Sequence, residues 1–170
     1  MSASSDQLTL LGHYQAAMAE LGFETRLSVE LAEGPGPLLT VGIPRDAAGR
    51  DRQLHIVFLP VAPEDELDNL TLLQWFTPLP LVLHPERIES VEGLLACINR
   101  RTALGYFGLS EQGRPFHRHV HATPKWSLPD PRSLQQMALV FVHMQDLFEP
   151  LIEAVAAGEL TLAQAEEILP

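Results

Sequence analysis

The N-terminal apolar residues recur at helical spacing, so we expect a first helix from about Asp6 to Leu21. Ser4, Ser5 or Asp6 can cap its start, and Gly22 stands where a helix stop is expected. The predicted buried stripe of this helix consists of Leu8, Leu11, Tyr14 or Gln15, Met18 and Leu21.

The pattern then changes to a period of two. Residues 23–31 alternate apolar and polar side chains, which predicts a half-buried strand. Glycines and prolines at 33–37 indicate a turn. Residues 38–43 and 53–60 predict two more strands on either side of a polar loop at 44–51. Three strands with short connections imply an antiparallel meander.

An acidic loop at 63–68 precedes an apolar, β-rich segment at 69–83. Pro78 and Pro80 interrupt this segment, and proline cannot donate to a sheet ladder, so we expect an edge strand there. Its large side chains favour a place in the core or in a dimer interface. An unpaired edge is also how some domains capture an extended peptide. The candidate partner-binding residues of this segment are Trp75, Phe76, Leu79 and Leu81.

The next stretch predicts a helix and a hairpin. Apolar spacing indicates a helix from Glu89 to about Arg101, with Ser90 as its cap. The predicted hairpin has strands at 103–110 and 114–122, joined by a turn that contains Gly113.

Two helices are expected at the C-terminal end. A long apolar stripe predicts a helix over 133–157, which Gly158 stops. Thr161 and Gln164 form a capping-box pattern for a last helix that ends at Leu169. The whole order predicts one α+β domain over 1–170: a twisted antiparallel sheet of five or six strands with helices packed on one face.

Composition narrows the class of protein. The chain has 170 residues, 46% of them hydrophobic, and one cysteine, which excludes an internal disulfide. The N-terminus lacks the pattern of a signal peptide, and no apolar run suits a membrane span, so we expect a cytoplasmic protein without membrane attachment. The net charge of −11 makes general nucleic-acid binding unlikely and suits a cationic or apolar partner.

The charge is also unevenly distributed. Residues 133–170 contain six acidic residues and no basic one, whereas residues 98–125 carry a net charge of +4. These two regions are expected to dock on each other, within the fold or across a dimer. Alternatively, Arg114 and Arg118 belong to a patch that binds a partner, and a nucleic acid is a third, weaker possibility for this basic segment.

Three histidines alternate along the second hairpin strand. His117, His119 and His121 are expected to share one face of that strand. Imidazoles are good metal ligands, but the outer two lie about 13 Å apart along an extended strand, too far to share one ion without bending. The main interpretation is a polar, partly exposed face near an interface. A metal site on His117, His119 and His121 is the alternative.

No arrangement of residues predicts catalysis. Cys97 lies beside the apolar stripe of its helix and is expected to be a small buried side chain. The chain has no glycine-rich phosphate loop, no nucleophile elbow and no His-Glu-x-x-His metalloprotease motif. We therefore predict neither an enzymatic activity nor a cofactor.

Residues 94–99 (Leu-Leu-Ala-Cys-Ile-Asn) and 104–111 (Leu-Gly-Tyr-Phe-Gly-Leu-Ser-Glu) form a helix end followed by a strand that enters a short turn. With the return strand at 114–122 and the long helix after it, this order resembles the YbjN-like family, which is similar to type III secretion chaperones. The resemblance implies a helix-on-sheet fold, homodimers and the binding of another protein or peptide, with no catalytic residues. The segment at 69–83, the last helix and the histidine row depart from the family pattern.

Two functions remain open at this stage. The first is a non-catalytic, chaperone-like or regulatory protein that binds another protein and forms a homodimer. The second is a metal-binding protein that uses the histidine row.

Overall fold

The computed structural model describes residues 5–29, 36–61 and 69–170. Several expected features lie wholly or partly outside these ranges: the predicted turn at 33–37, the acidic loop at 63–68, the capping role of Ser4 and the end of the first predicted strand. One antiparallel sheet of six strands forms the centre, in the order β1-β2-β3-β4-β6-β5. The strands are β1 Glu24–Ser28, β2 Leu38–Ile43, β3 Arg52–Phe58, β4 Leu70–Pro78, β5 Tyr106–Leu109 and β6 Pro115–Pro124.

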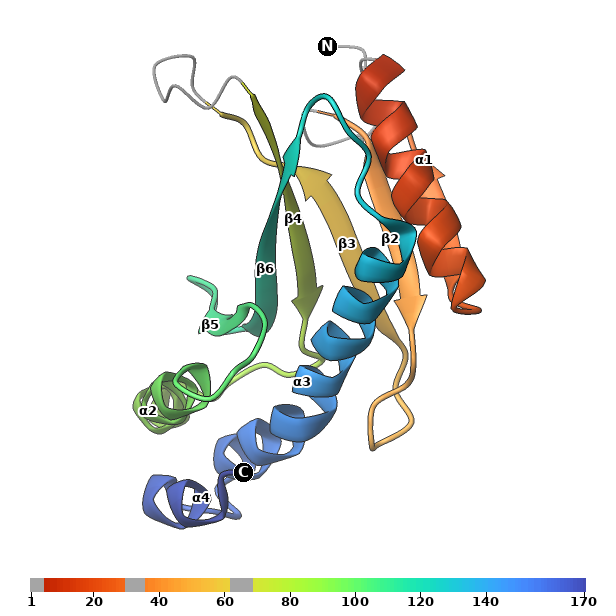
Figure 1. Ribbon diagram of the computed structural model, residues 1–170. Helices are drawn as coiled ribbons and strands as arrows, with labels where there is room; N and C mark the ends of the chain where they lie inside the picture. The colour runs from red at the N-terminus through yellow and green to blue at the C-terminus, as the bar shows by residue number, and fades with distance from the viewer. Residues whose placement is uncertain (1–4, 30–35, 62–68) are drawn as a thin grey trace.

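Four helices complete the fold: α1 Ser5–Glu20, α2 Ile88–Asn99, α3 Pro131–Ala157 and α4 Leu162–Ile168. Figure 1 shows α1 and α3 lying across the same face of the sheet. The C-terminal part of α3 extends past the end of the sheet, where α2 and α4 pack against it and against each other. The predicted α+β class is therefore confirmed.

The apolar core has two parts. The first lies between the sheet, α1 and the beginning of α3, and it contains Tyr14, Trp75 and Phe141. The second lies among α2, α4, β5 and the later turns of α3, around Phe107, Phe148 and Ile152. Because α3 contributes to both parts, it connects the sheet to the small helical end.

Local signals placed most helix ends correctly. Gly22 and Gly158 follow α1 and α3 with positive φ angles of 81° and 76°. Thr161 and Gln164 make the predicted capping box at the start of α4. The predicted Ser90 cap is wrong: α2 begins at Ile88, directly after a short 3-10 turn at Pro85–Arg87.

The prediction of an edge strand at 69–83 is also wrong. β4 lies inside the sheet and pairs with β3 on one side and β6 on the other. Pro78 is the last residue of β4 and Pro80 lies beyond it, so neither proline removes a hydrogen bond from the middle of the strand. The edges among the described strands are β1 and β5.

The described part of the chain contains no helix that is both long and apolar enough to cross a membrane.

Candidate functional site

The histidine row faces the helices, not the solvent. His117 is fully buried, and its ring stacks between Phe107 and Phe141, with centroid distances of 4.3 and 4.0 Å. Its Nε2 donates to the Leu104 carbonyl at 2.9 Å, which leaves Nδ1 to face the Gln145 amide. Burial lowers the pKa of His117 to about 4, and the neighbouring His119 adds to this effect. His117 is therefore a neutral core residue at neutral pH.

The other two histidines are half-buried. The rings of His119 and Trp75 meet in a T-shaped contact, and a 2.6 Å hydrogen bond joins His121 Nδ1 to the Tyr14 hydroxyl. Burial lowers the pKa of both imidazoles. Within the described ranges, no group of three potential ligand residues includes a histidine. The three imidazoles therefore do not converge on one point, and their side chains make contacts within the fold.

The remaining candidate residues lie in different places. Trp75 and Leu79 are buried, with 0% and 4% of their surface exposed, so neither offers a free anchor to a partner. Leu81 is half-buried against the second part of the core. Phe76 and Arg118 lie opposite each other on neighbouring strands, and Arg114 is exposed at the hairpin turn.

The sheet face opposite α1 and α3 is covered by none of the described helices. On this open face, the ring of Phe116 packs against the rings of Phe76 and Tyr106, with centroid distances of 5.2 and 5.9 Å. Arg118 donates to the Tyr106 hydroxyl at 2.8 Å. The exposed fractions are 39% for Tyr106 and 36% for Val120. The strand pleat places few charges on this face, with Glu24 and Arg26 on β1 and Arg118 on β6.

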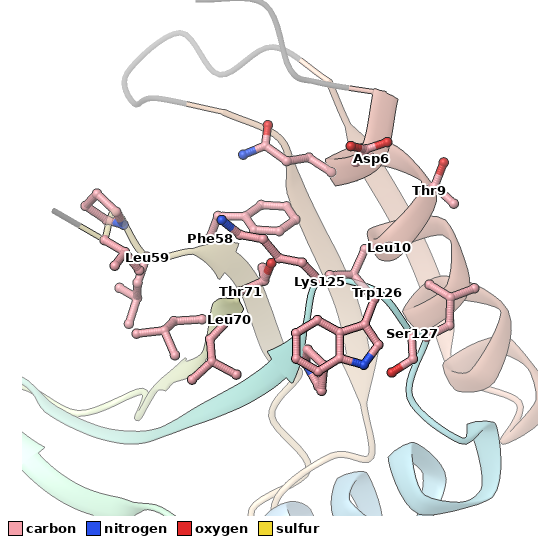
Figure 2. A pocket seen from close by; sticks show the side chains of 16 residues that line it. Asp6, Thr9, Leu10, Phe58, Leu59, Leu70, Thr71, Lys125, Trp126 and Ser127 are labelled. Carbon is pink, nitrogen blue, oxygen red and sulfur yellow. The ribbon is translucent and has the colours of Figure 1, made fainter. Parts of the chain in front are cut away.

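A groove of about 640 Å³ lies at one end of the sheet. Figure 2 shows it between the first turns of α1 and the ends of the central strands. The segment 124–128, which leaves β6 toward α3, forms one wall. Ten of its sixteen described lining residues are apolar, and the charged ones among these sixteen are Asp6 and Lys125. A groove of this size and composition is typical of a ligand or peptide site.

Two large apolar side chains of this wall are exposed. Trp126 has 72% of its surface accessible and Leu128 has 52%. Their segment is held at both ends, because the Lys125 amide donates to the Asn69 carbonyl at 3.0 Å and His13 bonds the Pro129 carbonyl at 2.6 Å. The sequence analysis missed this site. Its only signal was an aromatic residue in a proline-rich connection, which periodicity cannot interpret.

The acidic residues of α3 pair with a different partner from the one predicted. Arg52 on β3, with 1% of its side chain exposed, contacts Asp146 at 2.7 Å and Glu149 at 3.4 Å. Arg50, from the β2–β3 loop, contacts Glu153 and Asp46. Among the ion pairs of the described residues, none joins the acidic C-terminal region to residues 98–125. The two regions pack within the fold through uncharged contacts such as Phe107 with Phe148, and docking across a dimer stays a prediction.

Glu149 is the most unusual member of this ion network. Burial raises the pKa of its carboxyl to about 7, and the carboxylates of Asp46 and Glu153 add to the rise. The positive charges of Arg52 and Arg50 lower the pKa of this carboxyl and so oppose the rise. Its Oε1 atom is buried and has no hydrogen-bond partner within the described residues.

Cys97 is buried, as predicted, with 6% of its surface exposed. Its thiol contacts the Glu166 carboxylate at 2.9 Å, and this contact together with burial raises the pKa of the thiol. A thiol with a raised pKa is a poor nucleophile, so the site carries no chemistry that favours catalysis.

Neither a protein-family model nor a curated protein matches this chain.

Proposed function

We propose that the protein is a non-catalytic, chaperone-like binding protein that holds an apolar segment of another protein in the groove beside Trp126. The single observation that carries this proposal is the exposure of Trp126 at 72% on the wall of a 640 Å³ groove. Tryptophan is the side chain most enriched at the energetic centres of protein interfaces, because its burial removes a large apolar area from water.

The chemistry of the groove defines the kind of segment that fits. Leu10, Phe58 and Trp126 are arranged around the side chain of Lys125 in Figure 2. Among the described lining residues, the charges of Asp6 and Lys125 cancel, on a chain whose total charge is −11. An uncharged apolar segment is therefore favoured over an acidic one, which the rest of the surface repels.

The groove is shaped before any partner arrives. Backbone hydrogen bonds fix Lys125 to the start of β4, and His13 ties the segment to α1. Because a rigid wall loses little conformational freedom on binding, more of the apolar contact contributes to affinity.

The open sheet face supports the second part of the proposal, a homodimer. Phe76, Phe116 and Val120 form an apolar surface that an acidic protein would otherwise expose to water. Two acidic chains repel each other, and this face carries few charges, so it is the surface through which two copies can approach at the lowest electrostatic cost.

A photo-crosslinking amino acid at position 126, in the cells that make the protein, tests the groove. Position 82 serves as the matched control, because Val82 is also apolar, 67% exposed and outside the groove. We expect one protein to crosslink from position 126 and not from position 82. That crosslinked partner, once purified, must bind the wild-type chain. It must bind the Trp126→Ala variant more weakly. Equal crosslinking from both positions would contradict the proposal.

A further inference from the structure

A second, smaller hollow of about 230 Å³ lies at the opposite end of β3 from the groove. It is lined by the ion network of the β2–β3 loop and α3. Asp46, Glu149 and Glu153 each place a carboxylate oxygen within 4.8 Å of the other two. Two of the three are buried, so these oxygens converge in a space with restricted access to water.

One of these oxygens has an unmet need for a positive partner. Glu149 is 97% buried, since only 3% of its surface is exposed, and its Oε1 accepts no hydrogen bond from the described residues. The nearest cation is Arg50, whose Nη2 atom is 3.8 Å away. That distance is too long for a hydrogen bond, and a buried carboxyl oxygen without one is costly.

The two arginines of the network differ in how firmly they are held. Arg52 is 1% exposed and donates to Asp146 and to the Pro44 carbonyl at 2.7 Å each, so it is a fixed part of the fold. The Arg50 side chain is 37% exposed and reaches the carboxylates from the solvent side. It can rotate away without breaking the backbone bonds of its loop, in which Asp46 Oδ1 accepts from the amides of Ala48 and Arg50.

The spacing of the oxygens favours one class of ion. Hard divalent cations bind carboxylate oxygens, and Ca²⁺ takes them at about 2.3 to 2.6 Å, so opposite ligands lie about 4.8 Å apart. Mg²⁺ needs opposite ligands at about 4.2 Å, and it dehydrates reluctantly. Oxygens that all lie within 4.8 Å of one another fit around Ca²⁺, whose flexible coordination tolerates uneven ligand spacing better than that of Mg²⁺.

We propose that Asp46, Glu149 and Glu153 form a binding site for a divalent cation of the size of Ca²⁺, and that the Arg50 guanidinium occupies it when no metal is bound. The metal satisfies Glu149 Oε1 and displaces Arg50 toward the solvent. Around the site, the carboxylates of Asp46, Asp146, Glu149 and Glu153 pair with the guanidinium groups of Arg50 and Arg52. Arg45 also lines the hollow but pairs with Asp51, so a negative charge remains among the described residues for the cation to neutralise.

Titration calorimetry of the purified full chain with Ca²⁺, and separately with Mg²⁺, tests this proposal. We expect one Ca²⁺ per chain and weaker binding of Mg²⁺. Removal of the competing cation in Arg50→Gln tightens Ca²⁺ binding by about tenfold or more, and loss of a ligand charge in Glu149→Gln weakens it by about tenfold or more. Asp51→Asn is the matched control, because this carboxylate lies on the same loop, is 82% exposed and pairs only with Arg45 among the described residues.

Two results would overturn the site. One is the absence of Ca²⁺ binding to the wild-type chain at about 10 mM, far above the range of extracellular calcium modules. The other is an equal loss of affinity in Glu149→Gln and Asp51→Asn, which would mean diffuse attraction to an acidic surface. Circular dichroism checks that each variant is folded. If Arg50→Gln is not, the comparison of Glu149→Gln with Asp51→Asn still decides the outcome.

Discussion

Trp75 and Trp126, the only two tryptophans of the chain, lie in opposite environments: Trp75 has 0% of its surface exposed and Trp126 has 72%. Trp75 packs edge-on against Tyr14, His119 and Phe141, whereas Trp126 stands on the wall of the groove. Tryptophan fluorescence therefore reports on the groove without a label.

The first prediction concerns this contrast. In Trp75→Phe, where only Trp126 emits, acrylamide quenches the fluorescence strongly, because the indole is open to water. In Trp126→Phe the remaining Trp75 resists quenching and emits at shorter wavelength. Stern–Volmer slopes measure the difference. Equal slopes for the two variants would show that Trp126 is covered in solution.

The second prediction concerns the acid stability of the fold. The pKa of His117 is about 4 in the folded protein and 6.5 in a free side chain. The unfolded chain therefore takes up this proton first as pH falls from 6.5. The folded state loses on the order of 3 kcal/mol between pH 6.5 and pH 4, and the contribution of His117 to stability is fully present above pH 6.5.

Urea unfolding of the wild type and of His117→Gln, at pH 7 and at pH 4.5, isolates this effect. The variant is less stable at pH 7, because it loses the stacking between Phe107 and Phe141. Its free energy of unfolding falls less between the two pH values than that of the wild type. Parallel decreases in the two proteins would mean that His117 titrates normally and is not buried in solution.

The third prediction concerns Gly105, just before β5. Its φ is +74°, and an added Cβ would lie 2.5 Å from the Arg118 carbonyl oxygen and 2.9 Å from His117 Nε2. Gly105→Ala combines backbone strain with overpacking and costs about 2 to 4 kcal/mol. Gly22→Ala, at φ +81° with no atom within 4 Å, costs only about 1 to 2 kcal/mol. Thermal unfolding compares the two variants, and equal losses would contradict the close approach at Gly105.

The fourth prediction concerns the homodimer. Light scattering is expected to give twice the chain mass of 18.8 kDa. The Val120→Glu substitution places a charge on the open face. Because dimer formation would bury this charge in the interface, the variant is expected to be a monomer. Val140→Glu is the matched control, since Val140 is 39% exposed on α3 and Val120 is 36% exposed. A monomeric wild type would refute this part of the proposal.

The features that could be predicted from the sequence depend on nearby residues. The strand Leu38–Ile43 and the capping box of Thr161 and Gln164 match the structure, because alternation and capping act over a few residues. The position of β4 could not be predicted, since it depends on pairing with distant segments. Trp75 lies opposite Ile56 on one side and His119 on the other.

The candidate sites show the same division. The side chains of His117, His119 and His121 were correctly expected to share a face, but alternation does not tell which face the helices cover. The groove joins residues near Asp6, Phe58, Leu70 and Trp126, and the ion network joins Arg50 to Glu153, 103 positions apart. Neither site has a local motif, so both required the fold.

The most direct test of the groove is the affinity of the crosslinked partner for the wild type, for Trp126→Ala and for Val82→Ala. Calorimetry measures this affinity for all three proteins, and Trp126 fluorescence measures it where that residue is present. We expect Trp126→Ala to weaken binding by about 2 kcal/mol or more, close to thirtyfold, because it removes the central apolar anchor. Val82→Ala should bind as the wild type does. An unchanged affinity in Trp126→Ala, with the variant folded, would contradict the proposed function.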